Sequence, residues 1–182
     1  MNETGLHYKY KITVIGDPAV GKTSLIQTYT KGSFKTDYLP TIGAQFSVYE
    51  EEIEKVKFTL FLWDIAGQDK YHFLRPAFYE GSKAAIIVYS LEESEKGTES
   101  LKHIDEWHDD IKEYCGNIPI VLFGNKVDLV DEQALTDKKV SKIVDKEGFI
   151  GHYRTSAKTG TRVVEAFQAI VKALYTREDI SK

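Results

Sequence analysis

The sequence predicts an α/β fold built on a mostly parallel sheet with helices on both faces. Two stretches, Ala84–Leu91 and Ile118–Asn125, are continuously apolar, which is typical of strands that are covered on both faces. A segment with helical periodicity lies between them, and a helix is the usual connection between two parallel strands. Strands alternate with helices along the rest of the chain, which favours the same architecture.

The first third of the chain supplies three further strands. Lys9–Ile15 (KYKITVI) predicts a buried strand, and Lys22–Thr30 predicts a helix after it. The segment 31–43 is irregular because two glycines and a proline interrupt any periodicity. Gln45–Glu54 and Val56–Asp64 alternate between apolar and polar residues, so we expect them to pair as a hairpin.

The second half supplies two helices and a last strand. Between the two apolar runs, one helix is expected to place five residues near one face: Leu101, Ile104, His108, Ile111 and Cys115. The stretch 151–157 (GHYRTSA) predicts a short sixth strand. A final helix follows, with a 3.6-residue period of apolar residues: Val163, Ala166, Phe167, Ile170, Val171 and Leu174.

Composition limits the class of protein. The chain has 182 residues, 42% of them hydrophobic, which suits one globular domain. We expect this domain over residues 9–176, an N-terminal extension over 1–8 and a C-terminal tail over 177–182. The net charge of −4 argues against a nucleic-acid binder, and one cysteine excludes an internal disulfide. We therefore expect a cytoplasmic monomer.

A phosphate-binding motif follows the first predicted strand. Gly16-x4-Gly21-Lys22-Thr23 (GDPAVGKT) lies between a strand and a helix, which is the context this motif requires. Glycines let backbone N–H groups approach phosphate oxygens closely, and the helix N-terminus adds a positive dipole. Lys22 supplies a charge for the β- and γ-phosphates, and the Thr23 hydroxyl is suited to ligate Mg²⁺. The predicted nucleotide-binding residues of this loop are Asp17, Ala19, Val20, Gly21, Lys22, Thr23 and Ser24.

A second stretch, WDIAGQ, ends an apolar strand with an acid. Asp64 is placed to hold Mg²⁺ directly or through a water, opposite Thr23. The Gly67 N–H is expected to approach the γ-phosphate, and Gln68 is both donor and acceptor, which suits it to orient a water. Thr41, in the irregular segment YLPTIG, would complete the Mg²⁺ shell; read alone, it is a loop threonine.

Two more loops predict recognition of a base. NKVD (Asn125–Asp128) and TSAK (Thr155–Lys158) each follow a predicted strand. An aspartate carboxylate, here Asp128, accepts from N1–H and N2–H₂ of guanine, whereas adenine offers no such donor pair. The stems of Lys126 and Lys158 are expected to cover the ring, and Ala157 N–H to donate to O6. Asn125 and Ser156 complete the predicted set.

These motifs together resemble a small GTPase of the Ras superfamily from about Lys9 to Leu174. The resemblance implies a P-loop NTPase fold with a six-stranded sheet and five helices, and a switch between GTP and GDP states. It implies that Phe34 packs on the base and that Tyr38 closes over the phosphates. It also implies effector proteins, an exchange factor and a GTPase-activating protein as partners. The implied catalytic residues are Gln68, Lys22 and Thr41.

The Rab branch is the most similar part of the superfamily, through TIGAQF, FLWDIAGQDKY and FYEGSKAAIIVYSL. Rab proteins use an aromatic triad at effector surfaces, which would fall on Phe46, Trp63 and Phe78. Core packing of the hairpin is the competing interpretation of these aromatics. The chain ends in YTREDISK without a cysteine, so direct membrane anchoring is unsupported by the sequence.

One residue departs from what the phosphate loop needs. Pro18 has no N–H to offer a phosphate, and its ring occupies space near the water that Gln68 must orient. We expect slow intrinsic hydrolysis. The alternative function is a GTP-binding scaffold with little or no hydrolysis. His103 and His108 are five residues apart, which is not the spacing of a helical zinc pair, and His108 is expected to be packed or half-buried.

Overall fold

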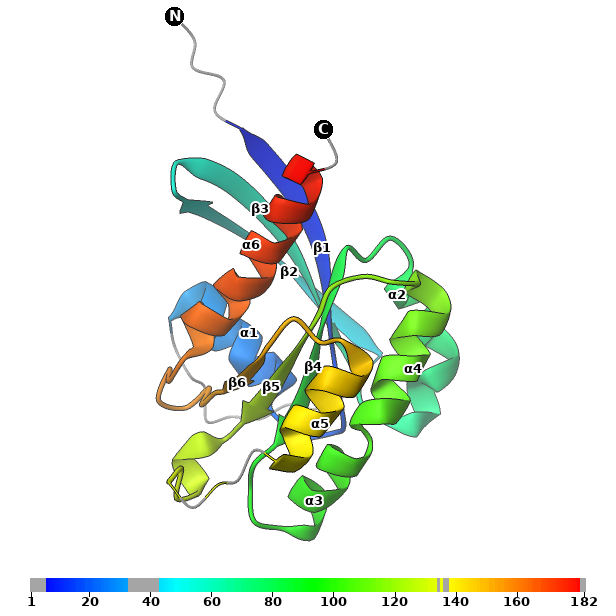
Figure 1. Cartoon of the computed structure of the whole chain (residues 1–182). Helices are drawn as coiled ribbons and strands as arrows, with labels where there is room; N and C mark the ends of the chain where they lie inside the picture. Colours follow the sequence, from blue (N-terminus) through cyan, green and yellow to red (C-terminus); the bar gives the residue numbers. More distant parts are fainter. Residues whose placement is uncertain (1–5, 33–42, 134, 136–137, 181–182) are drawn as a thin grey trace, which may run out of the picture.

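A computed structural model describes residues 6–32, 43–133, 135 and 138–180 of the chain. Within these residues the strands form one six-stranded sheet in the order β2-β3-β1-β4-β5-β6 (Figure 1). The strands are β1 (His7–Ile15), β2 (Ala44–Ile53), β3 (Val56–Ile65), β4 (Ala84–Ser90), β5 (Ile120–Asn125) and β6 (His152–Arg154). The mostly parallel sheet predicted from the sequence is confirmed.

The hairpin is the antiparallel part of the sheet. β2 pairs with β3 from Ala44 opposite Ile65 to Ile53 opposite Val56. The other pairs, β1 with β3 and β4, β4 with β5, and β5 with β6, are all parallel. β1 begins two residues before the predicted Lys9, and β6 is a short strand of three residues.

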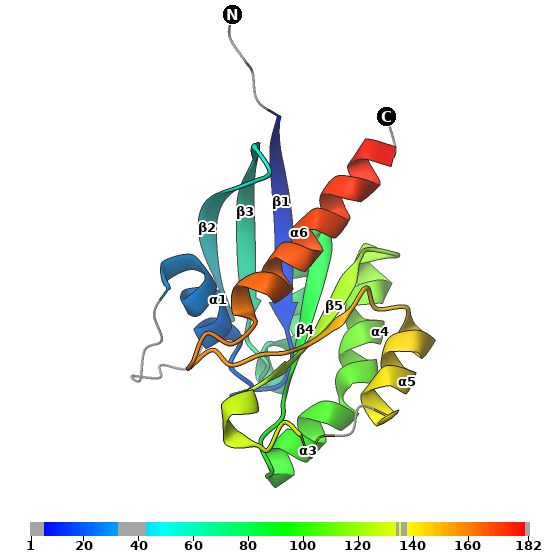
Figure 2. The same cartoon turned by 60° about the vertical axis from the view of Figure 1, so that its left-hand side comes forward.

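Helices cover both faces of the sheet (Figures 1 and 2). The helices are α1 (Lys22–Lys31), α2 (Arg75–Tyr79), α3 (Glu95–Lys102), α4 (Ile104–Cys115), α5 (Lys138–Glu147) and α6 (Val163–Ile180), with two 3₁₀ turns, η1 (Asp69–Leu74) and η2 (Val127–Leu129). One core cluster joins α1 and α6 to the sheet, and a second joins α2, α4 and α5 to its other face. The two clusters explain why β4 and β5 are buried at every position.

The structure corrects the expected number of helices. The described residues contain six α-helices rather than five, because the helix predicted between β4 and β5 is broken at His103 into α3 and α4. His103 has φ −81° and ψ 1°, outside helical geometry. Ile104, His108 and Ile111 are buried as predicted, and Leu101 and Cys115 are partly buried against the same cluster.

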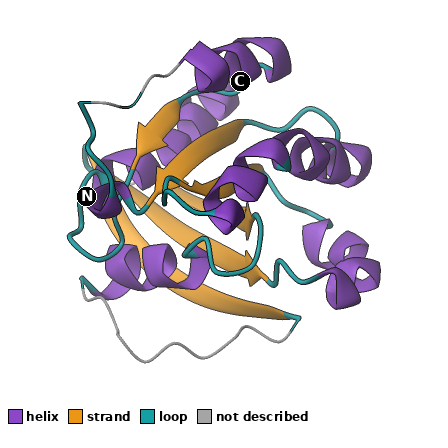
Figure 3. Ribbon diagram, turned by 90° about the horizontal axis from the view of Figure 1, so that it is seen from below, coloured by secondary structure: helices purple, strands orange, loops and turns teal. Residues whose placement is uncertain are grey.

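The parallel strands β1, β3, β4, β5 and β6 end at one edge of the sheet, and Figure 3 looks onto the molecule from that end. In an open α/β sheet, ligands bind outside the carboxyl ends of the strands. The loops after β1, β3, β5 and β6 carry the predicted motifs, so the topology brings these segments together. None of the described helices is long and apolar enough to cross a membrane.

Candidate nucleotide-binding site

The loop between β1 and α1 is shaped by its glycines. Gly21 precedes α1 with φ 103°, in the region that favours glycine. A Cβ on Gly21 would lie 2.2 Å from Nδ2 of Asn125. Any larger residue would therefore strain the backbone and push away Asn125, which comes from the end of β5.

Lys22 lies at the centre of this loop and is buried. Its Nζ donates to the carbonyl oxygens of Gly16 and Asp17, both at 2.7 Å. Burial lowers the pKa of Lys22 to about 8, while Asp64 and Asp17 raise it in part. The loop therefore wraps around an ammonium group whose charge protein carboxylates only partly offset, which is an environment suited to an anion.

Thr23 and Asp64 meet next to this lysine. The Thr23 Oγ1 donates to Oδ2 of Asp64 at 2.5 Å, and Asp64 is 3% exposed. A hydroxyl and a carboxylate are the oxygen donors that Mg²⁺ prefers. The two residues predicted as metal ligands are thus adjacent, and their chemistry fits the ion.

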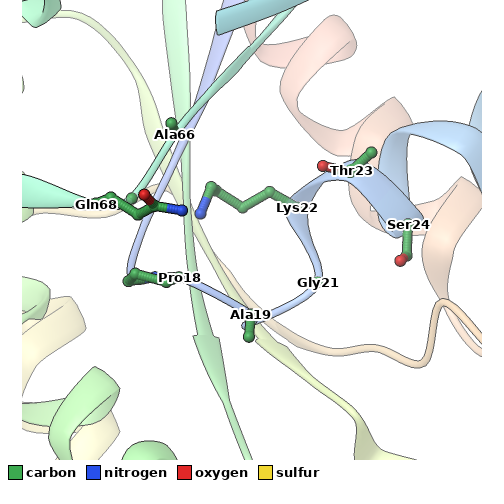
Figure 4. A pocket seen from close by; sticks show the side chains of 9 residues that line it. Pro18, Ala19, Gly21, Lys22, Thr23, Ser24, Ala66 and Gln68 are labelled. Carbon is green, nitrogen blue, oxygen red and sulfur yellow. The ribbon is translucent and has the colours of Figure 1, made fainter. Parts of the chain in front are cut away.

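The segment after β3 packs directly on the phosphate loop. A Cβ on Gly67 would lie 2.3 Å from the Gly16 carbonyl oxygen and 2.6 Å from the Pro18 nitrogen, so only glycine fits. Gln68 is half-buried, and Figure 4 shows its amide directed toward the Lys22 ammonium. Pro18 is exposed, and it lines the same pocket as Gln68 and Lys22. The predicted water-orienting residue and the discordant proline are therefore neighbours.

A second cavity, of about 280 Å³, continues from the phosphate loop toward β5 and β6. It is lined by Ala19, Gly21, Ser24, Asn125, Lys126, Asp128, Leu129, Ala157 and Lys158. Ser156 Oγ donates to Oδ1 of Asp128 at 2.6 Å. This bond orients the carboxylate at the wall of a pocket large enough for a base.

Asn125 joins three of the motif loops. Its Nδ2 donates to the Val20 carbonyl oxygen at 2.9 Å. Its Oδ1 accepts from Thr155 Oγ1 at 3.3 Å and from the Ala157 N–H at 3.2 Å. The Ala157 N–H, expected to donate to a base, thus has a protein acceptor here. Asn125 acts in the structure as the connection between the phosphate loop and the base pocket.

The sequence did not point to Glu92, which holds one of the predicted base-covering lysines. Lys126 Nζ lies 2.8 Å from Glu92 Oε2, and Lys126 has φ 69°. The hydrogen bond and charge of Lys126 lower the pKa of Glu92. Glu92 lies just after β4, in a loop without a recognisable motif, so the sequence offered no signal for this partner.

The sequence also missed the partners of Asp17. Its carboxylate contacts His103 and Trp107, which come from the break between α3 and α4 and from α4. Asp17 is predicted as a nucleotide-binding residue through its place in the loop. In the structure both carboxylate oxygens of Asp17 are engaged by these two residues.

The three predicted effector aromatics form one continuous row. The ring centroids of Phe46 and Trp63 are 5.7 Å apart, and those of Trp63 and Phe78 are 5.9 Å apart. Phe46 is 62% exposed, whereas Trp63 and Phe78 are partly buried against the core. Trp63 and Phe78 therefore pack against the core, while Phe46 leaves the row accessible from solvent. Phe34, Tyr38 and Thr41 lie outside the described residues.

The site defines a P-loop nucleotide-binding protein. It combines a phosphate loop around a buried lysine, an acid beside a threonine, and a base pocket with an aspartate in its wall. The Ras family profile matches residues 11–176. The chain is 37% identical over 169 residues to the Ras-related protein RABG3f of Arabidopsis thaliana, covering 89% of this chain and 80% of that protein.

Two further relatives agree. Rab7 of Cenchrus ciliaris is 37% identical over 169 residues, with the same coverage of 89% and 80%. Rab-7a of Dictyostelium discoideum is 32% identical over 174 residues, covering 93% of this chain and 84% of that protein. The chain belongs to the Ras family and is a small GTPase of its Rab branch. It is accordingly a GTP-hydrolysing molecular switch.

Proposed function

We propose that this chain binds GTP and GDP with Mg²⁺ in the continuous groove of the two cavities, and that its own residues set a slow rate of hydrolysis. The observation that carries the assignment is the meeting of Lys22, the Thr23–Asp64 pair and Asp128 along one edge of the sheet. Lys22 supplies a cation for the phosphates, the Thr23–Asp64 pair supplies ligands for the metal ion, and Asp128 supplies a hydrogen-bond acceptor for guanine.

The phosphates are held by the loop after β1. Lys22 supplies the cation for the β- and γ-phosphates, and the N–H groups from Asp17 to Ser24, Pro18 excepted, supply further donors. Thr23 and Asp64 hold the Mg²⁺ ion, with Thr41 as a further ligand from the segment outside the described residues. When bound, Mg²⁺ neutralises charge on the phosphate oxygens.

Gln68 orients the attacking water. Its half-buried amide lines the phosphate pocket, where it offers both a donor and an acceptor. Pro18 lies on the same pocket, and its ring restricts the positions that Gln68 and the water adopt. We infer slow intrinsic turnover, accelerated by an activating protein that supplies charge in trans.

Guanine is selected by Asp128. The carboxylate, oriented by Ser156, accepts from N1–H and N2–H₂, while Lys126 and Lys158 cover the ring faces. Adenine offers no such donor pair and would leave the Asp128 carboxylate unpaired at the pocket wall, which costs affinity. We also propose that the Phe46–Trp63–Phe78 row receives effector proteins, that an exchange factor reloads the site, and that the protein works as a cytoplasmic monomer.

The deciding experiment is single-turnover phosphate release from protein preloaded with GTP and Mg²⁺. We expect slow release from the wild type, at least tenfold slower release from Gln68→Leu, and faster release from Pro18→Gly. Glu113→Gln, on the exposed face of α4, serves as the control and should match the wild type.

The same measurement separates the switch from the scaffold. Bound GTP that stays intact in all four proteins would show a GTP-holding module whose hydrolysis needs a partner. Hydrolysis at equal rates in the wild type and Gln68→Leu would remove Gln68 from the mechanism.

A further inference from the structure

Asp17 has a hydrogen-bonding partner on each carboxylate oxygen. Its Oδ1 accepts from Trp107 Nε1 at 2.8 Å, and its Oδ2 lies 2.7 Å from His103 Nδ1. The Asp17 side chain is only 16% exposed, and Trp107 is 6% exposed. Two donors on a largely buried carboxylate restrict both its position and its orientation.

The backbone of the same residue holds the phosphate-binding lysine. The Asp17 carbonyl oxygen accepts from Lys22 Nζ at 2.7 Å. A shift of the Asp17 side chain therefore moves the peptide that directs Lys22. The helix pair and the phosphate site are connected through this single residue.

The spacing of the two donors along the chain places both of them at Asp17. The Trp107 backbone N–H donates to the His103 carbonyl oxygen at 3.0 Å, so the two residues are one helical turn apart and lie on one face. From there the imidazole and the indole reach the two oxygens of one carboxylate. We propose that His103 and Trp107 are positioning residues of the phosphate loop, which hold Asp17 and thereby slow the release of bound nucleotide.

The indole is itself held in place from its other side. The Arg75 guanidinium carbon lies 4.1 Å from the ring centroid of Trp107, and Arg75 Nη1 lies 3.3 Å from Asp110 Oδ2. Tyr79 also donates to that oxygen at 2.7 Å. Arg75 begins α2, so the indole contacts both the phosphate loop, through Asp17, and α2, through Arg75.

The contribution of His103 depends on pH. The groups that face or surround its ring are Asp17 from the loop, Glu99 from α3 and Glu106 from α4, with Asp69 and Arg75 on the wall of the shared cavity of about 270 Å³. The hydrogen bond to Asp17 raises the pKa of His103 above its usual value, against a smaller effect of burial. An imidazolium donates a stronger hydrogen bond to a carboxylate than a neutral imidazole does.

The raised pKa of His103 determines how nucleotide release changes with pH. His103 is protonated below its ordinary pKa of 6.5, and the protonated form is lost as the pH rises through the raised value. Nucleotide release should therefore become faster as the pH rises over this range. Lys22, with a pKa of about 8, loses part of its charge toward the upper end of this range, but every variant below keeps Lys22, so its effect is common to all of them.

The test is the release rate of a fluorescent GDP analogue from Mg²⁺-loaded protein, measured from pH 5.5 to 8. Trp107→Phe keeps an aromatic ring but removes Nε1–H, and His103→Ala removes the imidazole. We expect each to release the analogue about tenfold faster at pH 6. His103→Asn retains an amide N–H near the position of Nδ1, so its release should stay close to wild type at pH 8 and lose the pH dependence that His103 contributes below pH 7.5. Glu113→Gln is the matched control.

Thermal unfolding of each variant shows whether it folds. Release within twofold of wild type for both His103→Ala and Trp107→Phe would overturn the inference, as would an unchanged pH dependence in His103→Asn. The inference rests on the proposed function. Equilibrium binding of the GDP analogue distinguishes a failure of the positioning role from a failure of the proposed function. Failure of the wild type to bind the analogue would overturn both. Normal binding by the wild type, with release rates in the variants equal to that of the wild type, would overturn the positioning role alone.

Discussion

At the scale of single residues, the site is organised around a buried cation. Lys22 is surrounded by backbone carbonyl groups and two acids, and its ammonium is desolvated at some cost. The motif GDPAVGKT predicted the lysine and its task, because the spacing alone defines a phosphate loop. It did not predict the partners of Asp17, since those residues are 86 and 90 positions away in the chain.

The buried ammonium has a measurable consequence for stability. Because the folded-state pKa of Lys22 is about 8 against 10.5 for the free side chain, the unfolded chain binds more protons between these values. Stability therefore rises with pH in this window. We expect the free energy of unfolding of the nucleotide-free protein, measured in urea, to rise by about 2 kcal/mol from pH 7 to 9.5 relative to Lys22→Met.

Subtracting the Lys22→Met curve removes the contribution of the buried tyrosines, whose raised pKa values act at higher pH in the opposite direction. Parallel curves for the two proteins over this range would contradict the assignment of the charge to Lys22.

At the scale of secondary-structure elements, sequence patterns identified strands better than helix breaks. The runs in β4 and β5 are buried on both faces, so their apolar sequence carries a strong signal. The break at His103 has no such signal, because neither proline nor glycine lies there. The side chain at the break contacts Asp17, a tertiary partner 86 positions away that no local pattern contains.

The start of α3 depends on one capping residue. Ser94 is extended, with φ −143°, and its Oγ accepts from the Gly97 N–H at 3.1 Å. Ser94→Ala should lower the free energy of unfolding by about 1 kcal/mol, because a helix N–H loses its acceptor. Calorimetry should then show a melting temperature lower by about 2–4 °C.

Ser94→Asp is the matched control, since aspartate also caps helices and should retain most of the stability. Equal melting temperatures for the wild type and Ser94→Ala would show that the cap contributes nothing. Nucleotide affinity should be the same in all three proteins, because Ser94 does not line either cavity of the nucleotide groove.

At the scale of the whole molecule, the sheet brings distant motifs together. The loops after β1, β3, β5 and β6 are separated by up to about 140 residues in sequence, yet one side chain, that of Asn125, contacts both the first and the last of them. This convergence could be predicted, since parallel strands place their carboxyl ends at one edge. The hydrogen-bond partners within the convergence, such as Glu92 for Lys126, needed the structure.

Binding at that edge should stabilise the entire domain. With GDP and Mg²⁺ at 100 times the dissociation constant, the free energy of unfolding should rise by about 2.7 kcal/mol. ADP at the same concentration should leave it unchanged, because Asp128 finds no donor pair on adenine. Thermal unfolding in the presence of GDP or ADP measures this difference. The Asp128→Asn variant should lose the stabilisation by GDP.

Glu50→Gln, on the exposed edge strand β2, should respond to GDP like the wild type. Equal stabilisation by GDP and ADP would contradict base selection by Asp128.

The positions of the two tryptophans give the protein an optical property of its own. Trp63 lies in the Phe46–Trp63–Phe78 row with Lys11 Nζ 4.5 Å from its ring, and Trp107 lies against Asp17 with Arg75 on its face. The chain contains no other tryptophan. Its tryptophan fluorescence therefore arises from two sites, one beside the phosphate loop and one on the candidate effector surface. With Trp63 replaced by phenylalanine, emission from the remaining indole would follow the loop in real time, without any added label.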